Sequence, residues 1–257
     1  MALSVSYQRR HHRNGLGILD RARTPDAYTP VDRTYTDPES GQVQTITIYS
    51  LRPEFITARD RYISNVDVLR STYNGVQFDF QKRMSNRWQM LAGLSVQTHE
   101  GYDHNSTYTS IDLSNPNVSI NRTDGSVFID LPWTFTLSGS YMLPYDVLVS
   151  GKYTARAGEP LNRLTVFGGL PASQVSETIR LAQRGVDRTE SVTKFVDVRF
   201  GKRVRMGTTT IEPTLDIFNL LNANHVLLQT EQIGSAWGRP TRILTPRVLR
   251  VGVTAKF

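Results

Sequence analysis

The chain contains 257 residues with no cysteine, 39% hydrophobic residues and a net charge of +7. No stretch approaches the roughly 20 consecutive apolar residues of a membrane-spanning helix, which excludes such helices, and the lack of cysteine excludes disulfides and cysteine-ligated metal sites. The basic residues are dispersed, and their densest cluster, residues 8–13, lies in no RNA- or DNA-binding motif, so we expect no nucleic-acid partner.

The first predicted strand covers residues 1–10. Leu3, Val5 and Tyr7 alternate with small or polar residues, and a period of two is typical of a half-buried strand. No charged segment, apolar segment and small-residue cleavage site of a signal peptide comes before it. We therefore expect the chain to begin within a strand and to be a piece of a longer precursor.

A second extended segment covers residues 43–51, inside a long polar stretch over residues 11–70. One of its faces carries Val43, Thr45, Thr47 and Tyr49, and the other carries Gln44, Ile46, Ile48 and Ser50. We interpret it as a strand of the first long loop that extends beyond the membrane-crossing strands predicted below.

Two hairpins follow. Residues 70–84 and 87–97 turn at Ser85 and Asn86, and residues 129–143 and 146–156 turn at Pro144 and Tyr145. The strand over residues 129–143 is the most regular of these. Its apolar face carries Leu131, Trp133, Phe135, Leu137, Gly139, Tyr141 and Leu143.

A third hairpin and a final strand complete the pattern. Residues 193–206 and 208–219 turn near Met206 and Gly207, and the last strand covers residues 246–257. The apolar face of the last strand carries Leu249, Val251, Val253, Ala255 and Phe257. The chain thus contains about eight strands that are long enough to cross a bilayer when tilted.

The connections distinguish between the possible all-β folds. Turns of about two to four residues alternate with long polar segments around residues 11–70, 98–128, 157–192 and 220–244. Compact sandwiches favour connections of about 4–6 residues, whereas outer-membrane barrels have short periplasmic turns and long extracellular loops. We therefore predict an all-β fold, the antiparallel portion of a transmembrane β-barrel, with these turns and loops. The low average hydropathy agrees with this, because only alternate residues of each strand face lipid.

The end of the sequence resembles a known family. Residues 213–222, with the sequence PTLDIFNLLN, precede a loop with Trp237, Gly238 and Pro240 and a final strand opened by Pro246. This order is similar to the end of TonB-dependent outer-membrane receptors, and the likeness covers roughly residues 70–257. It is closest to the Oar-like branch.

The resemblance implies both a place and a function. It assigns residues 1–257 to the C-terminal part of a receptor barrel in the bacterial outer membrane, with the plug domain and the N-terminal strands absent. The implied function is TonB-dependent uptake of a ligand captured by the long loops. The implied partners are outer-membrane lipid, the barrel assembly machinery, the plug domain and periplasmic TonB.

Charged and polar residues on the face opposite the apolar one are candidates for ligand binding or for lining the lumen. These candidates are Gln77, Asp79, Lys152, Arg156, Asp197, Arg199, Arg203, Glu212, Asp216 and Arg250. Because buried charges need partners in any case, pairing with the plug or with each other is the commoner role of such residues. The candidate assembly signal, implied by resemblance, is Val251, Val253 and Phe257. Aromatic residues near the strand ends are expected to form interfacial girdles, among them Trp88, Trp133, Tyr141, Tyr145, Tyr153 and Phe257.

No catalytic or metal site is predicted. His99, Glu100, Asp103 and His104 cluster in one loop, and His11 and His12 lie in another, but their spacing fits no tight metal site. Motifs for nucleophilic catalysis and phosphate binding are missing from the sequence. We expect neither enzyme activity nor a cofactor.

Two alternatives stay open. One is a small eight-stranded barrel with a structural or adhesion role, its interior filled by side chains, and the other is a soluble carbohydrate-binding β-sandwich. A small barrel would require residues 1–10 to pair with residues 247–257. We expect instead an open, curved sheet in which these two segments lie far apart.

Overall fold

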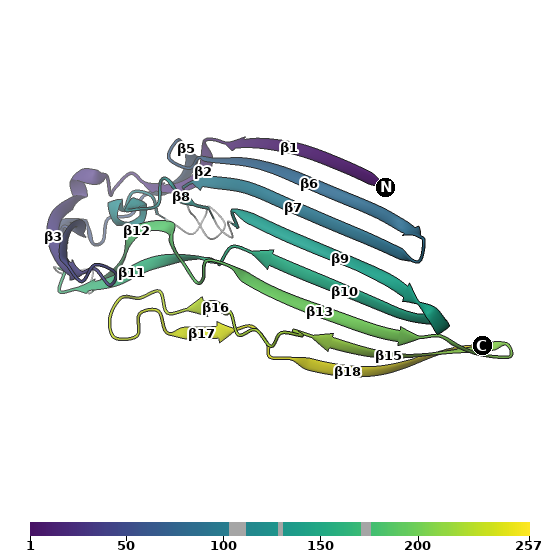
Figure 1. Ribbon diagram of the computed structural model, residues 1–257. Helices are drawn as coiled ribbons and strands as arrows, with labels where there is room; N and C mark the ends of the chain where they lie inside the picture. The colour runs from purple at the N-terminus through teal and green to yellow at the C-terminus, as the bar shows by residue number, and fades with distance from the viewer. Residues whose placement is uncertain (103–111, 128–130, 171–175) are drawn as a thin grey trace.

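The computed structural model describes residues 1–102, 112–127, 131–170 and 176–257. Most strands belong to one 10-stranded antiparallel sheet in which the long strands follow each other in chain order (Figure 1). The long strands are β1 (Ala2–His12), β6 (Ser71–Ser85), β7 (Trp88–Gly101), β9 (Trp133–Leu143), β10 (Val147–Arg156), β13 (Thr193–Lys202), β15 (Thr209–Phe218) and β18 (Val248–Lys256). The short strands β8 (Gly125–Ser126) and β14 (Val204–Met206) complete the sheet. The predicted fold class, all-β with long antiparallel strands, is confirmed.

The sheet differs from the prediction at one strand break. Residues 193–206 form two strands, because the ladder between β13 and β15 stops at Gly201 opposite Thr214 and resumes between β14 and β15 at Val204 opposite Ile211. Pro213 lies in the gap between these two ladders. A proline has no backbone N–H to donate, so a ladder interrupted beside it is the expected consequence.

The strand register gives the sheet two distinct faces. Val5, Phe78, Leu94 and Phe135 are successive partners across four strands. A second row consists of Tyr141, Val149, Phe200, Leu215 and Val251. A slip of one residue would move a whole apolar set to the opposite side, so the alternation in the sequence fixes this register. We call this side the apolar face and the opposite side the polar face.

The sheet is open at both edges. In the described chain β1 pairs only with β6, and β18 pairs only with β15. Figure 1 shows β1 and β18 at opposite margins of a single curved layer. The expected separation of residues 1–10 from residues 247–257 is therefore confirmed, and the described residues form neither the closed eight-stranded ladder nor the two stacked sheets of a sandwich.

The short turns all lie at one end of the strands (Figure 1). At the β6–β7 turn, Asn86 and Arg87 have φ values of 51° and 69°, as a type I′ hairpin requires. Lys82 lies in the apolar register beside this turn. Its Nζ donates to the carbonyl oxygens of Ser85 and Trp88, at 2.8 and 2.9 Å, and lies 3.8 Å from the centroid of a Trp88 ring. These contacts satisfy the buried ammonium of Lys82 on the apolar face.

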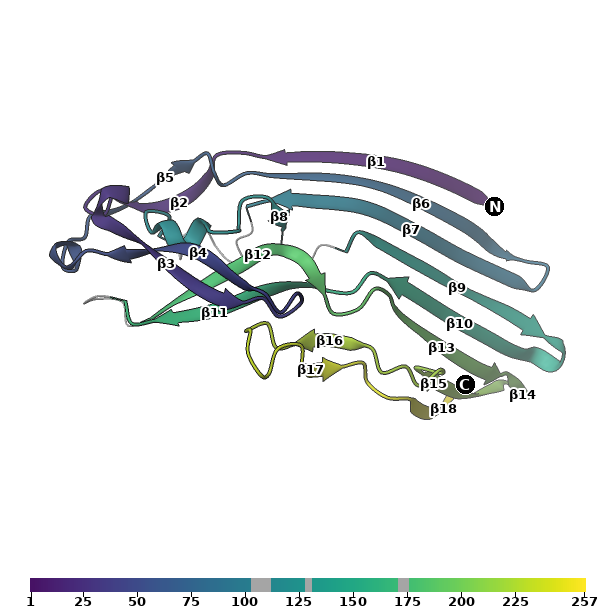
Figure 2. The same cartoon turned by 60° about the vertical axis from the view of Figure 1, so that its left-hand side comes forward.

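The long connections gather at the other end and contain further strands (Figure 2). These are β2 (Gly15–Asp20), β3 (Tyr28–Thr36), β4 (Val43–Leu51), β5 (Arg61–Val66), β11 (Pro160–Gly168), β12 (Ser176–Arg188), β16 (Val226–Gln229) and β17 (Pro240–Ile243). The predicted strand over residues 43–51 is β4, and the other strands of these loops are not predicted. No helix among the described residues is long and apolar enough to span a membrane.

All four long connections contribute side chains to one hydrophobic cluster. Ile48 from β4 is fully buried with Phe167 of β11 and with Ile179 and Leu181 of β12. Ile120, from the connection between β7 and β9, and Ile233, from the connection between β15 and β18, pack against this cluster. We call the assembled long connections the loop cap. It is held together by apolar burial, as a folded domain is.

Candidate functional site

Three of the predicted polar-face residues come together in one ion cluster. Arg199, Asp216 and Arg250 are direct partners across β13, β15 and β18. The Arg199 Nε and Nη2 atoms donate to the two carboxylate oxygens of Asp216, and the Arg250 Nε donates to Asp216 Oδ2 at 2.8 Å. Asp216 is buried between the two guanidinium groups. This cluster links three strands near the β18 edge of the sheet, and its two arginines and one aspartate carry a net charge of +1.

The other predicted polar-face residues lie apart from this cluster. Asp79 accepts a hydrogen bond from Gln77 Nε2 at 3.0 Å, and Asp197 accepts one from the backbone N of Asn219 at 2.9 Å. Arg156 Nη1 lies 2.9 Å from Glu159 Oε1. Lys152 lies between Ser138 and Asp197 in the ladder, and Glu212 is opposite Thr254.

Arg203 occupies a different place from the one predicted. It lies between β13 and β14, outside the strands, and its backbone N donates to the carbonyl oxygen of Asp146 at 3.1 Å. Arg203 is therefore part of the turn end of the sheet.

The candidate assembly residues lie on the apolar face of an edge strand. In β18, Val251 is 77% and Val253 68% exposed, and Phe257 follows with 98% exposed. Val253 is opposite Pro213 and Val251 opposite Leu215, so both share the face of the other large apolar residues. No described element covers these side chains.

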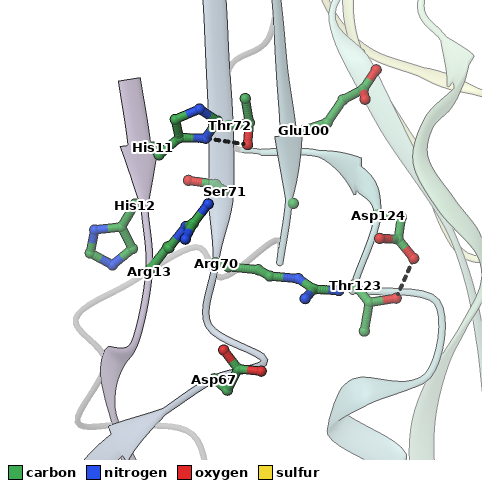
Figure 3. Close-up of a pocket in the computed structure, with 11 residues that line it drawn as sticks. His11, His12, Arg13, Asp67, Arg70, Ser71, Thr72, Glu100, Thr123 and Asp124 are labelled. Carbon is green, nitrogen blue, oxygen red and sulfur yellow. Dashed lines mark hydrogen bonds between the residues drawn. The ribbon is translucent and has the colours of Figure 1, made fainter. Parts of the chain in front are cut away.

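A polar pocket of about 550 Å³ opens where the long strands meet the loop cap. We call it the rim pocket. Figure 3 shows its side chains, which come from the end of β1, the flanks of β6 and β7, and the segment before β8. They include His11, His12, Arg13, Asp67, Arg70, Glu100, Thr123 and Asp124.

The rim pocket offers donors and acceptors of both charges. The Arg13 side chain enters from just after β1 and the Arg70 side chain from just before β6, and Arg70 extends toward Thr123 (Figure 3). The His11 ring Nδ1 is hydrogen-bonded to Thr72 Oγ1 at 3.0 Å, and Thr123 Oγ1 donates to Asp124 at 2.8 Å. Such a pocket suits a polar ligand with both anionic and cationic or hydroxyl groups.

Arg163 of β11 joins three of the long connections. Its guanidinium donates to both carboxylate oxygens of Asp187, at 3.0 and 2.6 Å, and to Asp37 Oδ2 at 2.5 Å. It also donates to Glu39 Oε2 at 3.0 Å and lies 5.9 Å from a Trp237 ring centroid. Arg163 and Asp37 are only 6% and 5% exposed, so the centre of this network is buried, and we call the network the clasp of the loop cap.

The clasp is reflected in the pKa values of its members. The backbone N–H groups of Ser40 and Glu39, the Ser40 hydroxyl and the Arg163 charge together hold the pKa of the Asp37 carboxyl below its ordinary value of 3.8. Hydrogen bonds from Arg163 to Asp187 and Glu39 raise the pKa of the guanidinium. Burial raises the pKa of the neighbouring Tyr35 hydroxyl. Asp37 and Arg163 are therefore ionised, and Tyr35 is neutral, at neutral pH.

The chain resembles two outer-membrane proteins of known structure. It is similar in structure to the outer membrane transporter YddB from Escherichia coli, with a TM-score of 0.49 and 10% sequence identity over 98% of this chain and 30% of that one. The siderophore receptor PirA from Acinetobacter baumannii gives the same TM-score and identity, over 98% of this chain and 29% of that one. The chain thus spans less than a third of either protein. No family model matches the sequence, and no curated protein matches it.

The possible metal ligands do not form a cluster in the part of the chain that the structure describes. In this part, no three His, Asp or Glu side chains are placed to hold a metal ion. His99 and Glu100 lie in β7, with the His99 ring edge-on to Tyr73 at 5.8 Å between centroids. Asp103 and His104 lie outside the described residues.

The residues of the rim pocket and of the clasp could not be recognised as sites from the sequence. His11, His12 and Glu100 were expected only to be loop residues, and no motif marks Arg163. Arg163 and Asp37 are 126 positions apart, so no local pattern signals their contact. The one available signal is the apolar alternation of residues 43–51, which indicates that the first loop has a core of its own.

Proposed function

We propose that the chain forms part of the wall of an outer-membrane barrel, which acts as a receptor and transporter for a ligand from outside the cell. One observation carries this proposal. An apolar face continues across all eight long strands, and no described element covers it. Leu3, Val5, Val251 and Val253 on this face are 60 to 77% exposed. An uncovered apolar surface of this extent is suited to lipid and costly in water.

The dimensions of the apolar face fit a bilayer. On β9 it runs from Trp133 to Leu143, a strand of 11 residues. At a rise of about 3.3 Å per residue this is about 33 Å, or about 25 Å in height when the strand is tilted by about 40°. That height matches the apolar band of outer-membrane barrels, with aromatic residues near both of its limits.

The two ends of the sheet suggest its orientation. The turn end has only short hairpins and would face the periplasm, and the loop cap would face outward. In this orientation the loop cap and the rim pocket capture the ligand. The ligand then passes along the polar face of the sheet. A plug domain, periplasmic TonB and the assembly machinery that reads Val251, Val253 and Phe257 are proposed partners, on the basis of the family resemblance alone.

Cysteine labelling tests the orientation, because the chain has no cysteine of its own. Thr45→Cys places a thiol at an exposed site in the loop cap, and Thr208→Cys places one in the turn between β14 and β15. On intact cells a membrane-impermeant maleimide should label the first variant and not the second. After the outer membrane is permeabilised, both should react. Labelling of only Thr208→Cys on intact cells would contradict the proposed orientation.

Uptake assays test the transport role. Cells with and without the gene should be compared for accumulation of labelled ferric chelates, oligosaccharides and peptides, each with and without a protonophore. We expect one class to accumulate only in cells that carry the gene, and the protonophore to abolish that accumulation. Equal accumulation of every probe in both strains would contradict a role in uptake.

A further inference from the structure

An open groove lies on the apolar face where β9 and β10 run side by side. It has a volume of about 630 Å³. Its floor includes Gly139 and Gly151, which are direct partners in the ladder between these two strands. A glycine has no side chain to pack, so two of them in register leave a hollow between larger neighbours. We call it the glycine groove.

The walls of the glycine groove are largely apolar and accessible. On the side of the loop cap lie Leu137 and Tyr153, which are partners across β9 and β10. On the side of the turn end, Tyr141 of β9 lies opposite Val149 of β10. Because Val149 is the smaller of these two, a hydrocarbon chain in the groove can extend over β10 toward the turn end. Tyr141 is 47% exposed and Gly151 is also exposed, so the groove is open to whatever covers the apolar face.

Three basic residues flank the β9–β10 turn, at the turn end of the sheet (Figure 1). Lys202 is the last residue of β13, in the ladder with β10 and in the register of the apolar face. The backbone N of Arg203 donates to the carbonyl oxygen of Asp146 at 3.1 Å. On the other side of the turn, the carbonyl oxygen of Arg87 accepts from the backbone N of Met142 at 2.7 Å. We call Arg87, Lys202 and Arg203 the basic collar.

The charge of the basic collar is not neutralised within the described residues. All three side chains are exposed, and none of them forms a salt bridge in the part of the chain that the structure describes. The turn itself contributes one carboxylate, Asp146, so the site has two positive charges in excess. Tyr145 of the same turn is 88% exposed. Basic side chains beside exposed aromatic ones are typical of a membrane interface.

The spacing of the groove and the collar fits one amphipathic ligand. On β10, Gly151 in the floor of the groove lies four residues from Val147, which is opposite Lys202. At a rise of about 3.3 Å per residue this separation is about 13 Å along the strand. A ligand with an anionic group at the collar can therefore place a hydrocarbon chain in the groove.

We propose that the glycine groove and the basic collar bind an anionic phospholipid of the periplasmic leaflet, with an acyl chain in the groove and the phosphate at the collar. This inference rests on the proposed function, because it requires the apolar face to lie against lipid. The basic residues would donate charge-assisted hydrogen bonds to the phosphate. Burial of the acyl chain against the apolar walls would add the hydrophobic contribution.

The charges argue against a second copy of the chain as the occupant. Two copies related by a twofold axis would place the same surface patch of each against the other. Their two basic collars would then face each other, and like charges across an interface are costly. A zwitterionic lipid would fill the groove but would leave the excess positive charge of the collar without a partner.

Native mass spectrometry of the full chain, released from detergent micelles, tests the proposal. The protein is titrated separately with dioleoylphosphatidylglycerol, with dioleoylphosphatidylcholine and with inorganic phosphate. We expect phosphatidylglycerol to bind about tenfold more tightly than phosphatidylcholine, because only the first carries a net negative charge. Inorganic phosphate should neither bind at the same concentrations nor displace phosphatidylglycerol, because it has no chain for the groove.

A charge variant tests the basic collar. Lys202→Gln should weaken phosphatidylglycerol binding about fivefold and leave phosphatidylcholine binding unchanged. Lys194→Gln is the matched control. Lys194 lies on the same strand and the same face as Lys202, at the end of β13 nearer the loop cap, and its replacement should change neither affinity.

A filling variant tests the glycine groove. A Cβ at Gly151 would lie 3.7 Å from the carbonyl oxygen of Asp197, which is ordinary van der Waals contact, so the sheet can accept a side chain there. Gly151→Leu should weaken the binding of both phospholipids about tenfold, as expected for the loss of about two buried methylene groups. Ala255→Leu enlarges a side chain on the same face of the distant strand β18 and should leave both affinities unchanged.

Insertion into lipid vesicles separates this proposal from the proposed function. Circular dichroism and heat-modifiable migration should show that the parent and each variant fold in lipid. The lipid site is overturned, and the membrane role stands, if the inserted parent binds both phospholipids equally. The same holds if folded Lys202→Gln and Gly151→Leu bind phosphatidylglycerol as tightly as the parent, or if the groove is covered in a lipid-free dimer. A parent that does not insert into vesicles contradicts the proposed function and this inference together.

Discussion

Arg199 and Asp216 lie directly opposite each other on β13 and β15, and the guanidinium of one donates to both carboxylate oxygens of the other. Arg250 reaches the same carboxylate from β18. Asp216→Asn leaves two arginines facing a neutral amide, so we expect a lower midpoint of urea unfolding in detergent. Arg250→Gln should have a smaller effect because Arg199 still pairs with Asp216.

A double-mutant cycle checks that the effect arises from the cluster. The combined Asp216→Asn and Arg250→Gln variant should lose less stability than the sum of the two single changes, because the second change relieves repulsion. If the midpoint shift of the double variant equals the sum of the shifts of the two single variants, the contacts carry no coupling energy.

The assignment of faces on β9 predicts an asymmetry between neighbouring positions. Leu137 lies opposite Ala92 and Tyr153 on the apolar face, and Ser138 lies on the polar face next to Lys152. Leu137→Arg should cost about 2–4 kcal/mol of folding free energy in lipid, and Ser138→Arg should cost much less. Folding titrations into lipid vesicles measure both. Equal losses of folding free energy for the two variants would contradict the assignment of Leu137 to the apolar face and Ser138 to the polar face.

The shared core of the loop cap predicts a second contrast. Ile48 is fully buried among side chains of β11 and β12, whereas Ile63 of β5 is 58% exposed. Ile48→Ala should destabilise the loop cap by about 3 kcal/mol, and Ile63→Ala should have little effect. Hydrogen exchange should show faster opening of residues 160–168 and 176–188 in Ile48→Ala. Unchanged exchange there would show that the long connections open independently.

The clasp at Arg163 predicts a response to acid. The folded pKa of Asp37 lies below its ordinary value of 3.8, so its stabilising contribution is complete above that value and is lost as the pH falls through the folded pKa. Limited proteolysis should therefore cut the β3–β4 hairpin faster below about pH 4. In the Asp37→Asn variant the protease should cut the hairpin faster at neutral pH than in the parent. The cleavage rate of this variant should also change less between neutral and acid pH. A parent protein with equal cleavage rates at pH 3 and pH 7 would contradict this.

The main sheet was predictable because its information is local. Each long strand alternates apolar and polar residues with a period of two, so the partners Leu137 and Tyr153 follow once the turn at Tyr145 is recognised. The break at Arg203 has a cause outside its own segment. Residues 193–206 alternate as one strand in the sequence, whereas the interruption depends on Pro213 of the neighbouring strand.

The loop cap was much harder to predict because its contacts are distant in sequence. Arg163 pairs with Asp187 at a separation of 24 residues and with Asp37 at a separation of 126. Asp20 is buried by segments that only the folded loops bring together, such as the one with Ser114. Sequence periodicity identifies β4 by its regular alternation, but it does not show which other loop Ile48 packs against.

The most direct test of the membrane assignment is a nitroxide scan along β9. Single cysteines from Trp133 to Leu143 in the full chain folded into lipid vesicles would carry the spin label, and collision rates with oxygen and with a water-soluble nickel chelate would be measured. The apolar face should favour oxygen at Phe135, Leu137 and Tyr141, and the polar face should favour the nickel chelate at Thr136, Ser138 and Ser140. An alternation with a period of two is the predicted result. Uniformly high access to the nickel chelate at all positions would contradict a membrane-spanning sheet.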